Sequence, residues 1–397
     1  MRVFTSLANP EYETGPFTDF ASVDSTTDLQ ALNLNWRERD LPERERTKHV
    51  HRLHPYLGKY IPQLVEIFLR KFRPNRIYDP FCGCGTTLVE ANTLGVDSVG
   101  CDISKFNCII TGAKTARYDI EKMEHELRHA LLQLDLALSP GLFGNKPPEV
   151  TTDNEYLRDW FHQDALRALL IYRSLIPAYR YQDLMSVVLS RSARSARLTT
   201  HHNLDFPAKP QREPYECRKH GGTCKPTADA YQFLNRYTFD TIERIRTFAS
   251  LRTNAKVQIL WDDARTAALP RFDMIMTSPP YVGLIDYHEQ HRYAYELLGL
   301  PRKDEQEIGA AAKGAGVKAA NDYLKNIGLV LSNARRHLTK NGIAVIVIGD
   351  RKNLYTGSFA SDLGFEPVER LRRHVNRRTG RRNGDFFEEV LIWKKAG

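Results

Sequence analysis

Short apolar runs recur near both ends of this chain, and each has the length of a buried strand. The clearest run spans residues 342–349, where Ile, Ala and Val follow one another without the alternation of a half-solvated strand. Such runs are typical of parallel strands that are covered on both faces. Further strands are predicted at 76–79, 98–102, 257–260, 272–276 and 389–393.

The segment 116–254 has a different pattern, dominated by helical periodicity. Helices are predicted at 121–137, 156–175 and 230–251, whereas residues 199–227 are irregular and contain four prolines. An αβ core does not need an insertion of about 140 residues. We therefore expect three parts: an N-terminal arm (1–50), an αβ core (51–115 and 255–397) and a mostly helical inserted domain (116–254).

Composition narrows the class of protein. A chain of 397 residues with 42% hydrophobic content is long enough to bury an αβ core and carry a second module. No window of eighteen apolar residues occurs and the first residues do not resemble a signal peptide, so we expect an intracellular protein with no membrane partner. The six cysteines indicate reduced thiols rather than a disulfide framework.

The formal net charge of +9 is unevenly distributed. Residues 372–382 contain six arginines and no acidic residue, at the predicted tip of a hairpin between the last two strands. Arginine without compensating Glu is typical of phosphate binding, although a solvated surface remains the alternative. A second set is spaced by three along a predicted helix. The candidate phosphate contacts are Arg377, Arg378, Arg381 and Arg382 in the first set, and Arg191, Arg194 and Arg197 in the second.

A proline-rich segment follows the predicted strand 272–276, with the sequence Thr-Ser-Pro-Pro-Tyr. Two prolines have fixed φ and no N–H, so they hold nearby carbonyls rigid and free to accept hydrogen bonds. Such a loop can accept hydrogens from a planar amine while the attached heterocycle stacks on the tyrosine. The alternative is a turn after a buried strand. The predicted catalytic residues are Ser278, Pro279, Pro280 and Tyr281.

A second motif, residues 76–87, runs from a strand through a glycine-rich turn into a helix. Gly83 and Gly85 remove side chains where a ligand would approach the backbone, and the helix N-terminus offers N–H groups. The next strand ends at Asp102, where nucleotide-binding folds place a carboxylate on ribose hydroxyls. A dinucleotide enzyme is the competitor, but the chain has Asp79-Pro80-Phe81 before the glycines and lacks Gly-x-Gly-x-x-Gly.

Together, the two motifs resemble those of S-adenosylmethionine-dependent DNA amino-methyltransferases, over about residues 50–112 and 255–395. Ser-Pro-Pro-Tyr resembles the cytosine-N4 branch more than the adenine branch, which usually opens with Asp or Asn. The resemblance implies an α/β, Rossmann-like class I methyltransferase fold with a mixed, mainly parallel seven-stranded sheet. It also implies S-adenosyl-L-methionine as cofactor, double-stranded DNA as substrate, and a cognate restriction endonuclease as a candidate partner.

The resemblance also assigns roles to individual residues. Residues 54–62 resemble a motif that flanks the methionine end of the cofactor, where Asp79 is also expected. Asp102 is expected on the ribose, and Asp263 on the adenine amine with Asp262 close behind. The predicted cofactor-binding residues are Tyr56, Lys59, Asp79, Pro80, Phe81, Cys82, Gly83, Gly85, Thr86, Asp102, Ile103, Asp262 and Asp263.

The implied reaction is direct methyl transfer to the 4-amino group of cytosine. Ser278 and the Pro279 carbonyl are expected to accept the amine hydrogens, and the extruded base to stack on Tyr281. The insertion would then read the target sequence, although it could instead be a cap that only packs or dimerises. Residues 302–316 are expected to be mobile and to order over substrate. Adenine-N6 methylation, RNA methylation and a non-enzymatic DNA-binding regulator remain alternatives.

The insertion contains three potential zinc ligands in a stretch of eight residues: Cys217, His220 and Cys224. A structural zinc site has four ligands, and His201 or His202 could supply the fourth only through the fold. We therefore predict no metal, and instead a loop with two free cysteines that presents Arg218 and Lys219 to DNA.

Overall fold

A computed structural model describes residues 16–36, 40–139, 151–217, 219–349, 353–375 and 386–397. A seven-stranded sheet in the order β5-β2-β1-β6-β7-β9-β8 forms its centre. The pairs from β5 to β7 are parallel, and β9 runs antiparallel between β7 and β8. This mixed, mainly parallel sheet confirms the predicted Rossmann-like fold class. Its strands are Arg76–Asp79 (β1), Asp97–Asp102 (β2), Val257–Trp261 (β5), Phe272–Thr277 (β6), Leu338–Ile348 (β7), Phe365–His374 (β8) and Phe387–Lys395 (β9).

The sheet is covered on both faces, which explains the continuous apolar run in β7. Alternate β7 side chains belong to two different apolar clusters, with Ile346 in one and Val347 in the other. The Ile346 cluster includes α12 (Val317–His337) and α13 (Gly357–Asp362). The Val347 cluster includes α2 (Pro62–Phe72) and the described part of the N-terminal arm. The arm is therefore part of the core on one face of the sheet.

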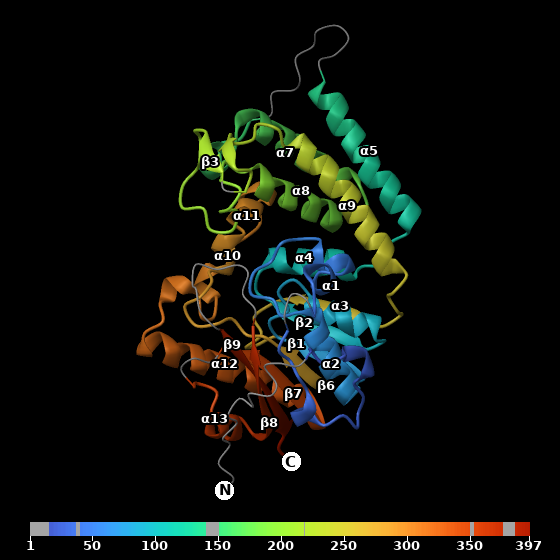
Figure 1. Cartoon of the computed structure of the whole chain (residues 1–397), viewed down its shortest axis with the longest axis vertical. Coiled ribbons are helices and arrows are strands. Elements are labelled where there is room, and N and C mark those ends of the chain that lie inside the picture. The colour runs from blue at the N-terminus through green and yellow to red at the C-terminus, as the bar shows by residue number, and fades with distance from the viewer. Residues whose placement is uncertain (1–15, 37–39, 140–150, 218, 350–352, 376–385) are drawn as a thin grey trace.

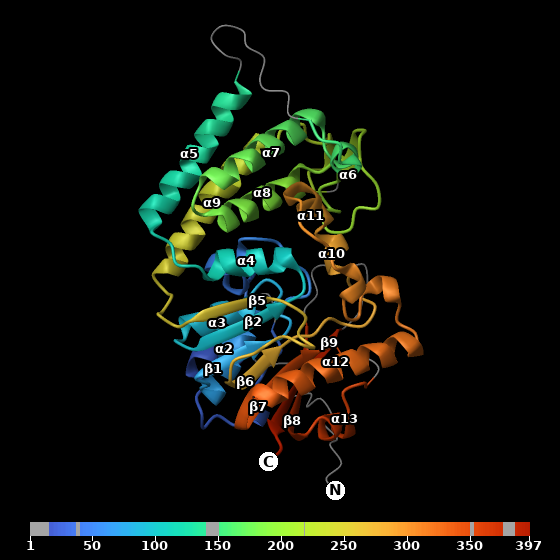
Figure 2. The same ribbon diagram turned by 180° about the vertical axis from the view of Figure 1, so that it is seen from behind.

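The inserted segment forms a helical layer beyond the β5 edge of the sheet, with the helix at residues 105–115 between them (Figures 1 and 2). The helix predicted at 156–175 is broken in two, because Phe161 is extended and forms a β-bridge with Arg197. His162 then caps the second helix by accepting a hydrogen bond from the Asp164 N–H. Helices of the layer are Ile120–Leu138 (α5), Glu155–Trp160 (α6), Gln163–Leu175 (α7), Gln182–Ala196 (α8) and Tyr231–Ala249 (α9), and a hairpin joins Tyr215–Cys217 (β3) to Gly222–Cys224 (β4).

The helical layer shares one apolar core with elements outside the predicted boundaries. Helix α4 (Lys105–Thr115), which packs beside β5, contributes Phe106 and Ile110 to the cluster that holds α7 and α8. Helix α11 (Arg292–Leu298), downstream of the proline-rich loop, also joins this cluster. The apolar core of the helical layer therefore includes residues on both sides of the predicted boundaries at 116 and 254.

The other α-helices of the described residues are α1 (Glu43–Arg46), α3 (Thr86–Thr93) and α10 (Tyr287–Gln290), and several short 3-10 helices lie between the elements. In the part of the chain that the structure describes, no helix has the length and apolar content needed to cross a membrane. All six cysteines are described, and none forms a disulfide.

Candidate active site

A cavity of about 880 Å³, counting its open mouth, lies at the carboxyl ends of the parallel strands. Asp79 ends β1, Asp102 ends β2, and Asp262 and Ser278 follow β5 and β6. Every predicted cofactor-binding residue except Gly85 lines this cavity, together with Ser278 and Pro280. Lining residues that were not among the individually predicted site residues are Gly58, Tyr60, Cys84, Ser104, Asn107, Ala264, Tyr287, His288, Gln306, Glu307 and Ile308; of these, Gly58, Tyr60 and Cys84 lie within the motifs at 54–62 and 76–87.

Asp79 joins the two sequence motifs directly. Its Oδ1 accepts hydrogen bonds from the Thr277 hydroxyl (2.7 Å) and the Phe81 N–H (3.1 Å). Its Oδ2 accepts from the hydroxyls of Thr87 (2.5 Å) and Tyr60 (3.2 Å). Burial raises the pKa of this carboxyl group, and the hydrogen bonds oppose that effect. Because four donors use its four acceptor sites, Asp79 fixes β6 against β1 and shapes the loop.

Asp102 is held differently and keeps acceptor capacity toward the cavity. Its Oδ2 accepts from the Gly83 N–H (2.8 Å), and its Oδ1 from the Ser104 N–H (2.8 Å) and the Asn107 amide (3.1 Å). Burial raises the pKa of Asp102 to about 6, although these donors oppose the shift. Three donors leave one acceptor site on Oδ2 for a ligand hydroxyl.

Of the two aspartates after β5, the structure favours Asp262 rather than the predicted Asp263 as the acceptor for a ligand amine. The Asp263 carboxylate accepts hydrogen bonds from Arg265, through its backbone N–H (2.9 Å), Nε (2.9 and 3.0 Å) and Nη2 (2.6 Å). Asp262 accepts one hydrogen bond on Oδ1, from the Asp263 N–H (2.7 Å). Both residues line the cavity, but Asp262 has the less occupied carboxylate. Asp262 is therefore the better candidate to accept from a ligand amine.

The two glycines of the turn have different roles. Gly83 lines the cavity with φ +49°, and a Cβ there would lie 3.0 Å from the Tyr56 hydroxyl. Gly85 precedes α3 (Thr86–Thr93) with φ +78°, and its Cβ would lie 2.7 Å from Cγ2 of Thr111. Gly85 is thus required for the backbone turn and for packing against α4, which corrects its predicted role in ligand approach.

The proline-rich loop presents Ser278 and Pro280 to the cavity. The Tyr281 hydroxyl donates to Oε1 of Glu388 (2.9 Å), whose Oε2 accepts from Nε (2.9 Å) and Nη2 (2.7 Å) of buried Arg373. A Cβ on Gly349 would lie 2.9 Å from the Tyr281 ring, so the ring packs closely on this glycine. Burial and then Glu388 raise the pKa of Tyr281 well above its usual value. Tyr281 is therefore a neutral donor whose ring is fixed by β9.

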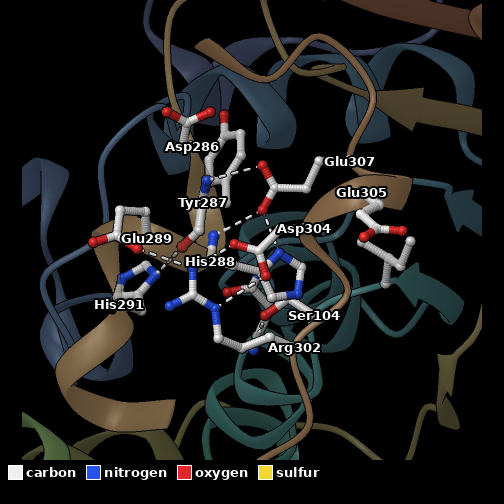
Figure 3. A network of polar contacts seen from close by, with 12 residues as sticks. Ser104, Asp286, Tyr287, His288, Glu289, His291, Arg302, Asp304, Glu305 and Glu307 are labelled. Carbon is white, nitrogen blue, oxygen red and sulfur yellow. Dashed lines mark hydrogen bonds and ion pairs between the residues drawn. The ribbon is translucent and has the colours of Figure 1, made fainter. Parts of the chain in front are cut away.

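The segment 302–316 is held by polar contacts around α10 (Figure 3). Glu307 accepts from the backbone N–H groups of Tyr287 (3.2 Å) and His288 (2.7 Å) and also bonds to Nδ1 of His288. Arg302 pairs with Glu289 (2.9 Å) and with Asp304. These contacts do not support the expectation that the segment is mobile before substrate binds. They place Glu307 and His288 in the cavity wall.

The arginines on α8 and at its C-cap are engaged inside the helical layer. Arg191 pairs with Asp240, Arg194 pairs with Asp205, and the Arg197 guanidinium lies 4.4 Å from the centre of the Tyr293 ring. Arg191 and Arg197 are buried. Because these groups already have internal partners, the structure does not support the prediction that this set binds phosphates.

The other predicted basic contacts have mixed outcomes. Lys219 is exposed at the β3–β4 turn. The cations at the start of that turn (Arg218) and at the predicted tip of the hairpin between the last two strands, called the basic finger below (Arg377, Arg378, Arg381 and Arg382), lie outside the described residues. The antiparallel pair β8 and β9 does confirm the predicted hairpin strands, down to the pairing of His374 with Phe387.

No protein-family model matches the chain. Among curated proteins, the type II methyltransferase M.MjaII of Methanocaldococcus jannaschii is 35% identical, over 89% of this chain and 82% of its own length. M.MvaI of Kocuria varians, also a type II methyltransferase, is 24% identical over 65% of this chain and 59% of its own length. M.BsoBI of Geobacillus stearothermophilus, a third such protein, is 23% identical over 72% and 60%, respectively.

Solved structures resemble the chain more distantly. TrmN from Thermus thermophilus matches with a TM-score of 0.32 and 12% identity, over 85% of this chain and 50% of that one. The rRNA methyltransferase AviRa from Streptomyces viridochromogenes matches with a TM-score of 0.32 and 14% identity, over 86% and 88%. Likenesses this low carry no argument about substrate.

Proposed function

The chain belongs to the type II methyltransferase family, and we propose that it methylates the exocyclic N4 amine of cytosine in duplex DNA. Its methyl donor is S-adenosylmethionine. The observation that carries the proposal is the hydrogen bond from Thr277 to Asp79, which puts two motifs 198 positions apart on the wall of one cavity. The Ser-Pro-Pro-Tyr form of the loop favours cytosine over adenine.

The cavity has the polar groups that such a cofactor requires. Asn107 Oδ1 and His288 Nε2 are buried in its wall and have no hydrogen-bond partner among the described residues. Asp102 and Asn107 can accept hydrogen bonds from ribose hydroxyls, and Asp262 from the adenine amine. Phe81 and Ile103 supply apolar wall for the adenine ring. When bound, the cofactor supplies an electrophilic methyl group on a sulfonium ion.

The chain's own residues prepare the amine for attack. In the proposed reaction, Ser278 Oγ and the Pro279 carbonyl accept hydrogen bonds from the two amine N–H groups, which draws the nitrogen lone pair out of conjugation with the ring. The nitrogen takes the methyl group as the S–CH3 bond breaks, which leaves a neutral thioether, and one amine proton is released to solvent. Within the described part of the chain, the Pro279 carbonyl accepts no hydrogen bond, so it remains available for this role. Tyr281 holds the loop through Glu388, and its ring is the proposed stacking surface for the base. Holding both reactants in one cavity supplies acceleration through positioning.

Recognition of DNA is proposed to use the helical layer and the basic finger. A cofactor cavity and one base pocket cannot read several base pairs, so an appended surface is required. Lys219 is an exposed cation on that layer, and Arg377, Arg378, Arg381 and Arg382 remain proposed phosphate contacts. A restriction endonuclease acting on the same site stays a prediction.

Mass analysis of nucleosides tests this function. The full chain is incubated with unmethylated duplex DNA of mixed sequence and with cofactor that carries a deuterated methyl group, and the DNA is then digested to nucleosides. We expect the label in N4-methyldeoxycytidine, separated by chromatography from the 5-methyl isomer. Label in N6-methyldeoxyadenosine would show that the same site methylates adenine instead of cytosine. Absence of label from the DNA nucleosides would contradict the proposal.

A further inference from the structure

Four metal-binding side chains meet at the β3–β4 hairpin, far in the sequence from the active-site motifs. Cys217 ends β3, His220 lies in the turn and Cys224 ends β4. His201, from the loop after α8, completes the group, so that one ligand atom of each residue lies within 4.8 Å of all the others. The structure thus supplies the fourth ligand that the sequence alone did not identify.

Two of the three separations between these ligand atoms fall in the range expected around one tetrahedral ion, and the third, 3.1 Å, is shorter. Nδ1 of His201 lies 3.4 Å from Sγ of Cys217, and Nδ1 of His220 lies 3.7 Å from the same sulfur. Nδ1 of His220 is also 3.1 Å from Sγ of Cys224. Zinc–sulfur bonds of about 2.3 Å and zinc–nitrogen bonds of about 2.0–2.1 Å in a tetrahedron place neighbouring ligand atoms about 3.3–3.8 Å apart.

Backbone and aromatic contacts around the group position its members. Gly221 adopts φ +67° in the turn, and the N–H groups of His220 and Gly221 both donate to the Cys217 carbonyl (3.2 and 2.9 Å). His201 is positioned by Tyr215, whose hydroxyl accepts from the His201 N–H (3.0 Å) and whose ring packs edge-on against the imidazole. These contacts bring a residue from another loop to the hairpin.

We propose that His201, Cys217, His220 and Cys224 bind one Zn²⁺ ion as a structural site. Two thiolates and two imidazoles form a ligand set that zinc prefers, and four protein ligands leave no open position for catalysis. This proposal replaces our prediction of two free cysteines without metal. The other group of three candidate ligands, His49, His51 and Glu90, is different, because the Lys48 ammonium already pairs with Glu90 at 2.9 Å.

The ion would hold the irregular segment 199–227 to the end of α8. Most side chains of that segment are exposed or half-buried, so it has little apolar core of its own. It is otherwise attached by a few contacts, such as the hydrogen bond from the Gln211 N–H to the Leu198 carbonyl (2.7 Å). A metal cross-link is a common means of stabilising such a segment.

Metal analysis of the full chain tests the site directly. The protein is produced with zinc in the medium, gel-filtered and analysed by mass spectrometry for bound metals; we expect one equivalent of Zn²⁺ per chain. Replacement by Co²⁺ is expected to give the visible absorption bands of tetrahedral cobalt and a near-ultraviolet thiolate charge-transfer band. A chain that contains no zinc and gives no such bands with Co²⁺ overturns the proposal.

Matched variants locate the ion. Cys217→Ser, Cys224→Ser and His201→Ala are each expected to lose the stoichiometric zinc, whereas His202→Ala, beside His201 but outside the group, should keep it. Removal of zinc by a chelator should lower the Tm of the wild-type chain and leave that of Cys224→Ser unchanged. Full zinc content in all three ligand variants would place the metal elsewhere and contradict the assignment, even if one variant folded poorly.

Discussion

At the scale of single residues, Asp102 connects the ionisation of one carboxyl group to cofactor binding. Its pKa is raised to about 6 by burial, and its proposed role requires the carboxylate as a hydrogen-bond acceptor. Ribose hydroxyls would stabilise the ionised form, so the cofactor-bound pKa should be lower than 6. Affinity should therefore rise as the pH increases through about 6 and then level off. We expect binding about five- to tenfold weaker at pH 5 than at pH 7.5, measured by calorimetry.

Asp102→Asn is the control for this prediction. It keeps the shape of the side chain but cannot titrate, so binding should be weak and should no longer change between pH 5 and pH 7.5. If the variant and the wild type show the same pH dependence, another group is responsible and Asp102 does not contact the ribose.

At the scale of elements, the α8 arginines have internal partners in the structure, whereas Arg377 and Arg378 remain proposed phosphate contacts. Arg194 on α8 pairs with Asp205 and is largely covered, so Arg194→Ala should lower the free energy of unfolding by about 1–3 kcal/mol. Its DNA affinity should keep the wild-type dependence on salt. Replacing Arg377 and Arg378 together should leave the free energy of unfolding unchanged but flatten the salt dependence of DNA affinity. Each phosphate that the protein ceases to neutralise reduces the logarithmic salt slope by about 0.9. Thermal melts and binding titrations at several salt concentrations measure both effects.

Two results would contradict these roles of the arginines. A flatter salt dependence for Arg194→Ala, with an unchanged Tm, would return α8 to the DNA-binding surface. An unchanged salt slope for the finger variant would leave the finger as a solvated surface.

What the sequence could predict at this scale depended on local signals. The apolar run of β7 and the glycine turn before α3 are local patterns, and both were located correctly. The partners of Tyr281 and Arg194 are not local, since Glu388 and Asp205 reach them only through tertiary packing. His201, the proposed fourth zinc ligand, could be named from the sequence only as an alternative to His202 for the same reason. Long-range polar partners therefore had to come from the structure.

At the scale of the whole molecule, the sheet and the helical layer share packing that should make them unfold together. The α4–α8 contact and the hydrogen bond between His54 Nε2 and Ser190 Oγ (3.0 Å) cross between the two parts. We expect a single denaturant transition that coincides for far-ultraviolet circular dichroism and tryptophan fluorescence. Saturating cofactor at about 100 times its Kd should stabilise the whole chain by about 2.7 kcal/mol. Two separated transitions would show that the insertion is an independent domain.

The central claim for the whole molecule is that the Ser278–Tyr281 loop and the cofactor cavity form one active site. Single-turnover methylation by Ser278→Ala, compared with wild type on the same duplex, tests it most directly. We expect the rate of methyl transfer to fall by about ten- to a hundredfold, as for loss of one hydrogen bond to the reacting group (about 1.4–2.7 kcal/mol). Cofactor affinity and DNA affinity, measured on the same preparations, should stay within about twofold of wild type. Methyl transfer at the wild-type rate would contradict the claim, because the loop would then take no part in the chemistry.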